Sequence, residues 1–448
     1  MRLILDEALT PDGWQDDVLV TWQDGIFTEV TPSADPAQAV GAERVAGVAL
    51  PGVGNLHSHA FQRGFAGLTE RRGDGAADHF WTWREAMYRF ANTIEPEDLQ
   101  AIAALSQVEM LESGFTAVAE FHYVHHQRDG RPYDDPAEMA TAVVAAAGTT
   151  GIGLTLLPVF YAHGGFGNEP ANDGQRRFVS DLDGFARLHA SAATAVKSLP
   201  GGRIGIAPHS LRAVAPEELK ILAGLHCGGP IHIHVAEQLA EVDDCLAATG
   251  RRPVDRLIDL VAVDAGWCLI HATHVTPEEI ARIAASGAVV GLCPITEADL
   301  GDGIFPGVDL IDNGGVFGVG SDSNVLISLP QELRLLEQSQ RLHDRARNRL
   351  ARPPHSTGRT LFDVAAKGGA QALGNGAGRI AVGAPADLVV LDTDHPALIG
   401  RHGDARLDAL VFACPDNPVR DVWARGRHVV TAGRHVARAE IVSAWRKA

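Results

Sequence analysis

The sequence predicts an α/β fold: a (β/α)8 barrel of the TIM type, with a small β-sandwich domain built from both ends of the chain. Three observations support this prediction. Eight short apolar runs alternate with long helical patterns in residues 51–377. Further strand patterns occur outside that region, in residues 1–50 and 378–448. The chain has 448 residues, of which 46% are hydrophobic, so it can fill one large core and an accessory domain.

The two chain ends predict strands rather than helices. Residues 3–5, 18–22 and 26–30 cluster or alternate apolar residues between turn signals such as Asp24-Gly25. Strand patterns return after residue 377, at 386–391, 419–423 and 428–431. Each end alone is too short for a stable β-domain, so we expect the two ends to pair in one small sandwich.

The barrel strands are predicted from the runs of apolar and β-branched residues. The first run begins at Pro51 and ends in His57 and His59. The other seven are residues 115–123, 152–161, 203–209, 231–237, 267–271, 288–293 and 316–321. Helices are predicted at 96–112, 138–147, 276–285 and 361–373. The first three of these begin near a proline or a polar cap, which suits the unpaired N–H groups of a helix start.

Charge and cysteine content narrow the function classes. The 38 basic and 56 acidic residues give a net charge of -18, which disfavours nucleic acid and anionic membrane surfaces as partners. The N-terminus lacks a signal-peptide pattern, and no apolar run approaches the ~20 residues of a membrane span. We therefore expect a cytoplasmic protein, and we also expect a homodimer. The five scattered cysteines are predicted to be reduced: Cys227, Cys245, Cys268, Cys293 and Cys414.

A His-x-His pair, His57 and His59, ends the first barrel strand. Side chains at i and i+2 of a strand share a face, so two imidazoles would point to one place. A lone pair of this kind is more often two solvent-facing histidines than a metal site. A catalytic metal needs three or four protein ligands, so partners are required elsewhere in the chain.

Three further strand ends carry suitable groups. The fifth strand ends in His232-Ile233-His234 and is followed by Glu237, and the sixth ends at His271 and is followed by His274. The eighth is followed by Asp322. Each could be an ordinary core or surface residue. Because a barrel brings its strand ends together, their joint placement indicates one site.

These stretches resemble known proteins. PGVGNLHSH, HIHVAE, HATH and GSDS resemble the metal-binding stations of the amidohydrolase superfamily, and GRIAVGAPADLVVLD resembles its return to the end domain. HSHAFQRG, FWTWRE, AEFHYVHH, APHSLRAV, HVAEQ and TEADLGDGIFP are similar to the formimidoylglutamate deiminase family within it. The resemblance covers nearly the whole chain. It implies hydrolysis of N-formimidoyl-L-glutamate, a small dicarboxylate, to N-formyl-L-glutamate and ammonia.

The resemblance also implies a metal site. The implied ligands of one divalent metal ion are His57, His59, His234 and Asp322. Three imidazoles and a carboxylate suit Zn²⁺, although iron or another divalent ion also fits. Two-metal members of the superfamily commonly carry a lysine or Glu at the end of the fourth strand. This chain has His209 there, which indicates a mononuclear site.

Catalytic roles follow from the same resemblance. Glu237 would carry a proton from the attacking water to the leaving nitrogen; its alternative is a surface Glu at a helix start. His271 would bond the water or the developing oxyanion, and Asp322 would be both ligand and proton acceptor. Either His271 or Asp322 would take the first proton from water. His232, His274 and Asp299 are interpreted as supporting residues.

The substrate contacts implied by the resemblance are Gln62, Arg84, Tyr123, His209 and Arg212. Arginine suits a dicarboxylate because its planar fork makes two parallel bonds to one carboxylate. The acidic chain needs such local positive charge to hold an anion. Alternatively, the two arginines are surface residues, and the aromatic residues next to Arg84 are ordinary packing.

Two positions depart from the family pattern, and two rival functions remain. Asn324 stands where a histidine often follows the Ser-Asp-Ser of strand eight, and Asp299 where an asparagine is common. Both leave the metal set unchanged and bear only on substrate contacts. One rival is a deaminase of a heterocycle such as guanine or cytosine. The other is a catalytically silent scaffold, which would lack a ligand or Glu237.

Overall fold

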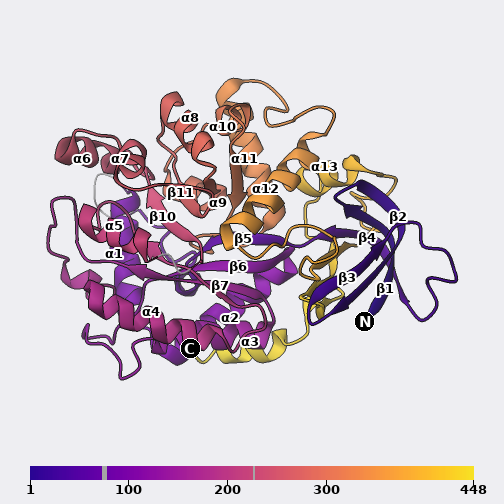
Figure 1. The fold of residues 1–448 in the computed structure, drawn as a ribbon, viewed down its shortest axis with the longest axis horizontal. Helices are drawn as coiled ribbons and strands as arrows, with labels where there is room; N and C mark the ends of the chain where they lie inside the picture. The colour runs from indigo at the N-terminus through magenta and orange to yellow at the C-terminus, as the bar shows by residue number, and fades with distance from the viewer. Residues whose placement is uncertain (73–77, 226–227) are drawn as a thin grey trace.

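The computed structural model describes residues 1–72, 78–225 and 228–448. Parallel strands surrounded by helices form one region, and a mixed sheet made from both chain ends lies beside it (Figure 1). The parallel strands come in the chain order that a TIM-type barrel has.

Each of the eight predicted barrel runs contains strand. The parallel strands are β5 (Val53–Ser58), β6 (Phe115–His122), β7 (Gly153–Phe160), β8 (Arg203–Ile204), β9 (Ala207–Pro208), β10 (Ile231–Val235), β11 (Trp267–His271), β12 (Val289–Leu292) and β13 (Val316–Val319). The fourth predicted strand is interrupted between β8 and β9. Gly205 lies in this gap, where a Cβ would be 2.2 Å from the Pro230 carbonyl oxygen, so the close approach of two backbones requires glycine.

These strands are divided between two parallel sheets. One has the order β5-β6-β7-β8, with β9 also paired to β7, and the other has the order β10-β11-β12-β13. Isolated parallel bridges connect the two sheets at both edges: Ile206 pairs with Ile231, and Ser58 pairs with Asp322. The second bridge places the residues after β5 directly beside those after β13.

Helices separate the parallel strands. They are α1 (Phe80–Ala91), α2 (Pro96–Glu112), α3 (Glu138–Thr150), α4 (Leu182–Val196), α5 (Pro216–Gly224), α6 (Leu239–Thr249), α7 (Pro253–Leu260), α8 (Pro277–Ser286), α9 (Pro294–Leu300), α10 (Gly307–Asp312), α11 (Leu329–Asp344) and α12 (Thr357–Leu373), with short 3₁₀ helices η1 (Ala60–Phe65) and η2 (Asp173–Gln175). The structure places α2 at the predicted bounds. It begins α12 four residues earlier than predicted, because the Ser356 side chain caps it by accepting from the Arg359 N–H.

The chain ends pair as expected, in one mixed sheet of eight strands with the order β17-β16-β15-β14-β4-β1-β2-β3. These strands are β1 (Arg2–Thr10), β2 (Gly13–Gln23), β3 (Ile26–Thr31), β4 (Glu43–Pro51), β14 (Leu388–Leu391), β15 (Val419–Ala424), β16 (Arg427–Thr431) and β17 (Arg434–His435). The link between the ends is the antiparallel pair of β4 and β14. This sheet has its own apolar core, which includes Leu3, Val20, Leu388 and Trp423.

Two helices follow in the C-terminal part, α13 (Asp404–Phe412) and α14 (Arg438–Trp445). The last one leaves the mixed sheet and packs against α2, where Arg438 forms an ion pair with Glu112 (Figure 1). The chain end is thereby held on the region of parallel strands.

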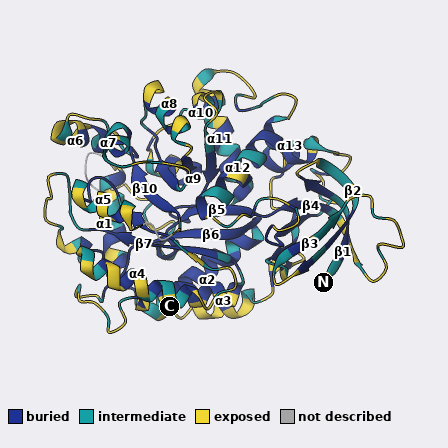
Figure 2. Cartoon of the chain, viewed as in Figure 1, coloured by how far each residue is buried: buried dark blue, intermediate teal, exposed yellow. Residues whose placement is uncertain are grey.

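Burial follows the layers (Figure 2). Every residue of β6 and β10 is buried, whereas the exposed residues of α4 lie on its outer side. Parallel strands covered on both faces read as continuous apolar runs, which explains why these strands were visible in the sequence. Polar side chains in such strands lie inside the molecule, and the candidate site is built from them.

The junction between the two regions contains a buried acid, Asp387. It accepts hydrogen bonds from the Arg425 N–H and the Thr116 hydroxyl, and burial raises its pKa from 3.8 to about 6. Ionisation of Asp387 therefore lowers the free energy of unfolding by about 3 kcal/mol above pH 6 and has no effect on it below pH 4. Asp387→Asn should raise the free energy of unfolding at pH 8 by ~1 to 3 kcal/mol and leave it unchanged near pH 4.

Denaturant unfolding across this pH range measures the effect of Asp387→Asn. The exposed Asp394→Asn is the control, and its effect should stay within ~0.5 kcal/mol at every pH. An equal gain from Asp387→Asn at pH 4 and pH 8 would contradict the role of the charge.

The described residues include no helix long and apolar enough to cross a bilayer. The free cysteines recorded in this part of the chain are Cys245, Cys268, Cys293 and Cys414, all buried. Cys227 lies outside the described residues.

Candidate metal and substrate site

Four predicted ligands lie together at the carboxyl ends of the parallel strands. His57 is in β5, His59 follows it, His234 is in β10, and Asp322 follows β13. The His57 and His234 Nε2 atoms are 3.1 Å apart. Asp322 Oδ1 lies 3.5 Å from His57 Nε2 and 3.3 Å from His59 Nε2. All four side chains are at most 6% exposed, so a cation bound here would be removed from solvent.

These atoms fit a divalent metal ion. The Nδ1 atoms of His59 and His234 lie 2.9 and 3.1 Å from the carbonyl oxygens of Phe121 and His209, so each Nδ1 carries the proton. Each Nε2 is then bare and turns its lone pair toward the others, and burial lowers the pKa of both rings, which keeps them neutral. Tetrahedral zinc ligands would be about 3.3 Å apart, close to the observed 3.1 to 3.5 Å.

The loops that carry these groups hold an unusual backbone. Ala236, His271 and Asp322 have φ values of 52°, 66° and 44°, in the left-handed region that L-residues avoid. Such conformations persist where surrounding contacts impose them, and they are frequent at functional sites. These conformations therefore mark three strand ends of the candidate site.

A second group of side chains lies beside the first. Glu237 Oε1 is 3.6 Å from His271 Nε2, and Asp322 Oδ2 is 3.7 Å from the same nitrogen. Burial raises the pKa of Glu237 to about 7, although His271 lowers it in part. Burial lowers the pKa of His271, but the carboxylates around it prevail and raise it to about 10. A carboxyl group that titrates near neutral pH is suited to proton transfer.

Two carboxylates here were not predicted as site residues. Glu297 Oε1 lies 3.2 Å from His271 Nδ1, and Asp302 accepts a hydrogen bond from Gln238. Both are 5% exposed. Glu297 could bind a cation together with His271 and Cys293, and Asp302 together with His271 and Glu237. The available sequence signal was their position: Glu297 stands four residues after the seventh strand run and Asp302 nine residues after it.

An inner cavity of about 50 Å³ adjoins the metal candidate. It contains all five predicted substrate contacts, Gln62, Arg84, Tyr123, His209 and Arg212, together with the predicted ligands His59, His234 and Asp322. Gln62 Nε2 donates to the Tyr123 hydroxyl at 2.9 Å, while the Gln62 Oε1 atom is buried without a partner. The lining of the cavity combines apolar and aromatic side chains with hydrogen-bonding groups.

The two predicted arginines flank one indole ring. The Cζ atoms of Arg84 and Arg212 lie 4.3 and 5.7 Å from the centre of the Trp81 ring. Arg212 is only 8% exposed and its Nε has no hydrogen-bond partner. Within residues 1–72, 78–225 and 228–448, neither arginine forms an ion pair with a carboxylate. A buried guanidinium that lacks a carboxylate is costly unless an anionic ligand supplies one.

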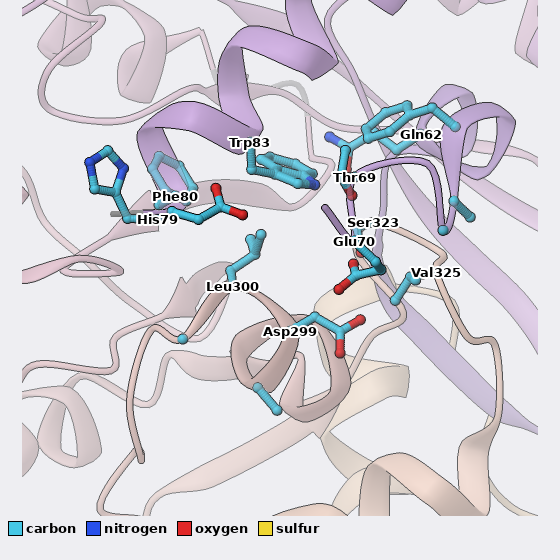
Figure 3. Close-up of a pocket in the computed structure, with 16 residues that line it drawn as sticks. Gln62, Thr69, Glu70, His79, Phe80, Trp83, Asp299, Leu300, Ser323 and Val325 are labelled. Atoms are coloured by element: carbon cyan, nitrogen blue, oxygen red, sulfur yellow. The ribbon is translucent and has the colours of Figure 1, made fainter. Parts of the chain in front are cut away.

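An outer cavity of about 260 Å³ is lined in part by exposed residues such as Glu70 and His79 (Figure 3). Gln62, Phe80, Trp83 and Leu300 line both cavities and therefore separate them. Glu70 and Asp299 line the outer one (Figure 3). Asp299 is thus not among the residues that line the inner cavity, although it shares the outer one with Gln62.

Other predicted residues have supporting positions. Buried Asn324, one of the two departures from the family pattern, donates to Ser58 Oγ and to the His59 carbonyl oxygen, at 3.1 Å each. These hydrogen bonds connect the end of β5 to the loop after β13. His232 and His274 contact the carbonyl oxygens of Ala372 and Asp302 through Nε2. Neither histidine is among the residues that line the inner cavity.

Sequence reasoning also missed an aromatic wall. Tyr88 and Tyr161 line the inner cavity, and Gln175 Nε2 donates to both hydroxyl oxygens. Tyr161 directly follows β7, which was the one available signal. Tyr88 lies in α1, which the sequence reading did not predict as a helix.

Comparison with known proteins gives three findings. A model of the amidohydrolase family matches residues 48–429. A formimidoylglutamate deiminase of Pseudomonas aeruginosa is 52% identical over 436 residues, which cover 97% of this chain and 95% of that protein. A crystal structure of an amidohydrolase from Brucella melitensis superposes with a TM-score of 0.94 at 50% identity, over 100% of this chain and 98% of that one.

A more distant solved structure shares the fold. It is an adenosine deaminase from Xanthomonas campestris with bound zinc, with a TM-score of 0.83 and 23% identity over 100% of this chain and 97% of that one. This likeness supports a TIM-type barrel with an additional domain.

Proposed function

The chain belongs to the amidohydrolase family, and from that premise we propose that it hydrolyses N-formimidoyl-L-glutamate to N-formyl-L-glutamate and ammonia. It is a hydrolase that acts on a carbon–nitrogen bond of a small molecule. The observation that carries the choice of substrate is the inner cavity, where two arginines that form no ion pair with any described residue lie beside a histidine-rich candidate metal site. A dicarboxylate supplies the anions that these arginines lack.

Ammonia release tests this function directly. Purified protein should release ammonia from N-formimidoyl-L-glutamate, and not from guanine or cytosine at the same concentration. Metal analysis of the same sample gives the ion and its stoichiometry. Release from a heterocycle alone would replace the proposal with the rival deaminase, and release from none of the three would remove both.

One divalent metal ion, with zinc as the preferred candidate, is proposed to bind His57, His59, His234 and Asp322. The spacing of the four ligand atoms supports this set, and so does the proton placement on His59 and His234. A bound metal would act as a Lewis acid and lower the pKa of a water molecule toward ~7.

The chain's own residues would then move the protons. We propose that Asp322 accepts the first proton from the attacking water, and that Glu237 delivers a proton to the departing nitrogen. His271, the other predicted acceptor, has a pKa raised to about 10 and would instead donate a hydrogen bond to the developing oxyanion. The 3.6 Å separation between Glu237 and His271, and the raised pKa of Glu237, support this division of roles. In total, one water replaces the formimidoyl nitrogen, which leaves as ammonia.

Arg84 and Arg212 are proposed to bind the carboxylates of the substrate. Arg212→Lys keeps the charge but loses the planar fork. The fall in kcat/KM should correspond to a loss of ~1 to 3 kcal/mol of transition-state stabilisation, the range for a charged hydrogen bond. Arg212→Met and Arg84→Met should lose at least as much. The metal content should not change, because neither arginine is a proposed ligand.

Steady-state kinetics with two substrates tests the arginine pair. N-formimidoyl-L-glutamate is compared with an analogue that lacks the α-carboxylate, and the arginine that binds that group should lose its effect on the analogue. Arg334→Lys is the matched control, since Arg334 donates to backbone carbonyl oxygens far from the cavity. Small and equal losses on both substrates would contradict the proposed contacts.

The finer division of the fold is also a proposal. We propose that residues 51–377 form a closed (β/α)8 barrel, supported by the bridges Ile206–Ile231 and Ser58–Asp322. Residues 1–50 and 378–448 would form the second domain, folded as a sandwich around the core that includes Leu3 and Trp423. The homodimer and the cytoplasmic location stay predictions, which sedimentation and cell fractionation would test.

A further inference from the structure

Glu297 contacts a proposed catalytic group without lining the inner cavity. It lies in the first turn of α9 and is 5% exposed. Its Oε1 atom is 3.2 Å from His271 Nδ1 and accepts a hydrogen bond from the Cys293 N–H at 2.9 Å. The carboxylate therefore contacts the ring nitrogen opposite to the one that lies near Glu237 and Asp322.

We infer that Glu297 is a positioning residue, whose carboxylate holds the Nδ1–H of His271 and thereby keeps Nε2 turned toward the reacting atoms. This inference rests on the proposed function, because it assigns Glu297 to the same reaction. It differs from the roles proposed above, since Glu297 would act only through His271.

The hydrogen-bonding chemistry determines the orientation of the ring. An ionised carboxylate only accepts hydrogen bonds, so the nitrogen it contacts must carry a proton. With Nδ1 protonated, Nε2 is left for the side that holds Glu237 and Asp322, at 3.6 and 3.7 Å. A buried carboxylate that fixes the tautomer and orientation of a catalytic imidazole has the same task in the Ser-His-Asp triad.

The surroundings of His271 leave room for this control. One face of the His271 ring stacks on His234, with ring centres 5.6 Å apart and an angle of 11° between planes. Stacking restricts tilting of the ring, but it does not distinguish Nδ1 from Nε2. Glu297 supplies that distinction, because within the described part of the chain it is the side chain that hydrogen-bonds His271 Nδ1.

A purely structural role is the alternative. Glu297 accepts the Cys293 N–H at the start of α9, and such a cap stabilises a helix whatever the histidine does. Glu218 offers a matched control, because it accepts the Ala215 N–H at the start of α5 and contacts His163 Nε2 at 3.1 Å. Glu218 does not line the inner cavity.

Kinetics separates the two roles. In Glu297→Ala, kcat should fall by ~10²-fold, within the range of acid–base contributions, while KM and metal content change little. Glu297→Gln keeps the cap but loses the charge, so it should also lose activity; it serves as the second variant if Glu297→Ala does not fold. Glu218→Ala should lower thermal stability but leave kcat unchanged.

A double-mutant cycle makes the test specific. If Glu297 acts through His271, then adding Glu297→Gln to the His271→Asn variant should lower kcat little further. A loss of activation free energy in Glu297→Gln/His271→Asn that equals the sum of the losses in Glu297→Gln and His271→Asn would overturn the inference. Loss of kcat in Glu218→Ala equal to that in Glu297→Ala would also overturn it, since capping would then explain both.

Proton NMR tests the contact independently of the substrate. The wild-type protein should show a low-field imidazole N–H resonance that disappears in His271→Asn and in Glu297→Ala but persists in Glu218→Ala. Its absence from the wild type, or its persistence in Glu297→Ala, contradicts the contact. Inactivity of the wild type toward N-formimidoyl-L-glutamate would instead count against the proposed function, while this resonance still reports on Glu297 and His271.

Discussion

His234→Ala is expected to remove the metal and reduce turnover by ~10³-fold or more, because Lewis-acid stabilisation is worth several kcal/mol. His234 Nε2 lies 3.1 Å from His57 Nε2, and its other nitrogen is fixed by the His209 carbonyl oxygen. Alanine removes one of the four proposed ligands and leaves a gap in the site, so the ion should be held much less firmly. Elemental analysis and ammonia release from one protein sample measure both effects.

The matched control is His232→Gln. His232 is equally buried and stands two residues before His234, but its Nε2 contacts the Ala372 carbonyl oxygen. This variant should keep one metal per chain even if it is less stable. Full metal in His234→Ala, or two metals per chain in the wild type, would contradict the proposed mononuclear site.

Glu237→Gln is expected to reduce kcat by ~10²- to 10⁴-fold, the contribution of a positioned acid–base group. Glutamine preserves size and hydrogen bonding but cannot carry a proton. Because burial raises the pKa of Glu237 to about 7, the group can both accept and release a proton near neutral pH. Metal content and substrate binding should be retained, which isothermal titration with the substrate would measure.

Glu241→Gln controls for the loss of one buried carboxylate. Glu241 is 1% exposed and accepts the Glu237 N–H at 3.1 Å, but among the described residues it is Glu237, and not Glu241, that forms an ion pair with His271. Glutamine can still accept that N–H, so kcat should change far less than in Glu237→Gln. A Glu237→Gln variant with nearly normal kcat would exclude the proton-transfer role.

Much of the fold was predictable because its signals are local. Buried parallel strands appear as apolar runs, and α2 begins at the proline that predicts it. The fourth strand was harder, since the close approach at Gly205 divides it into β8 and β9. The helix α1 was missed because no proline marks its start as Pro96 marks that of α2, although its buried residues recur at helical spacing.

The sequence by itself determined which groups stand at the strand ends. The spacing of His57 and His59 is a local property, because side chains two apart in a strand share a face. The order of strands along the chain places His234 and Asp322 at the same edge, and the structure brings all four groups together.

Only the tertiary structure decided which side chains from distant parts of the chain contact the site residues. Glu297 and His271 are 26 residues apart on different elements, and Arg84 and Arg212 meet at Trp81 across more than a hundred residues. No local periodicity encodes such contacts. They depend on the packing of helices and loops above the strand ends and on the left-handed turn at His271, which three-dimensional packing must impose.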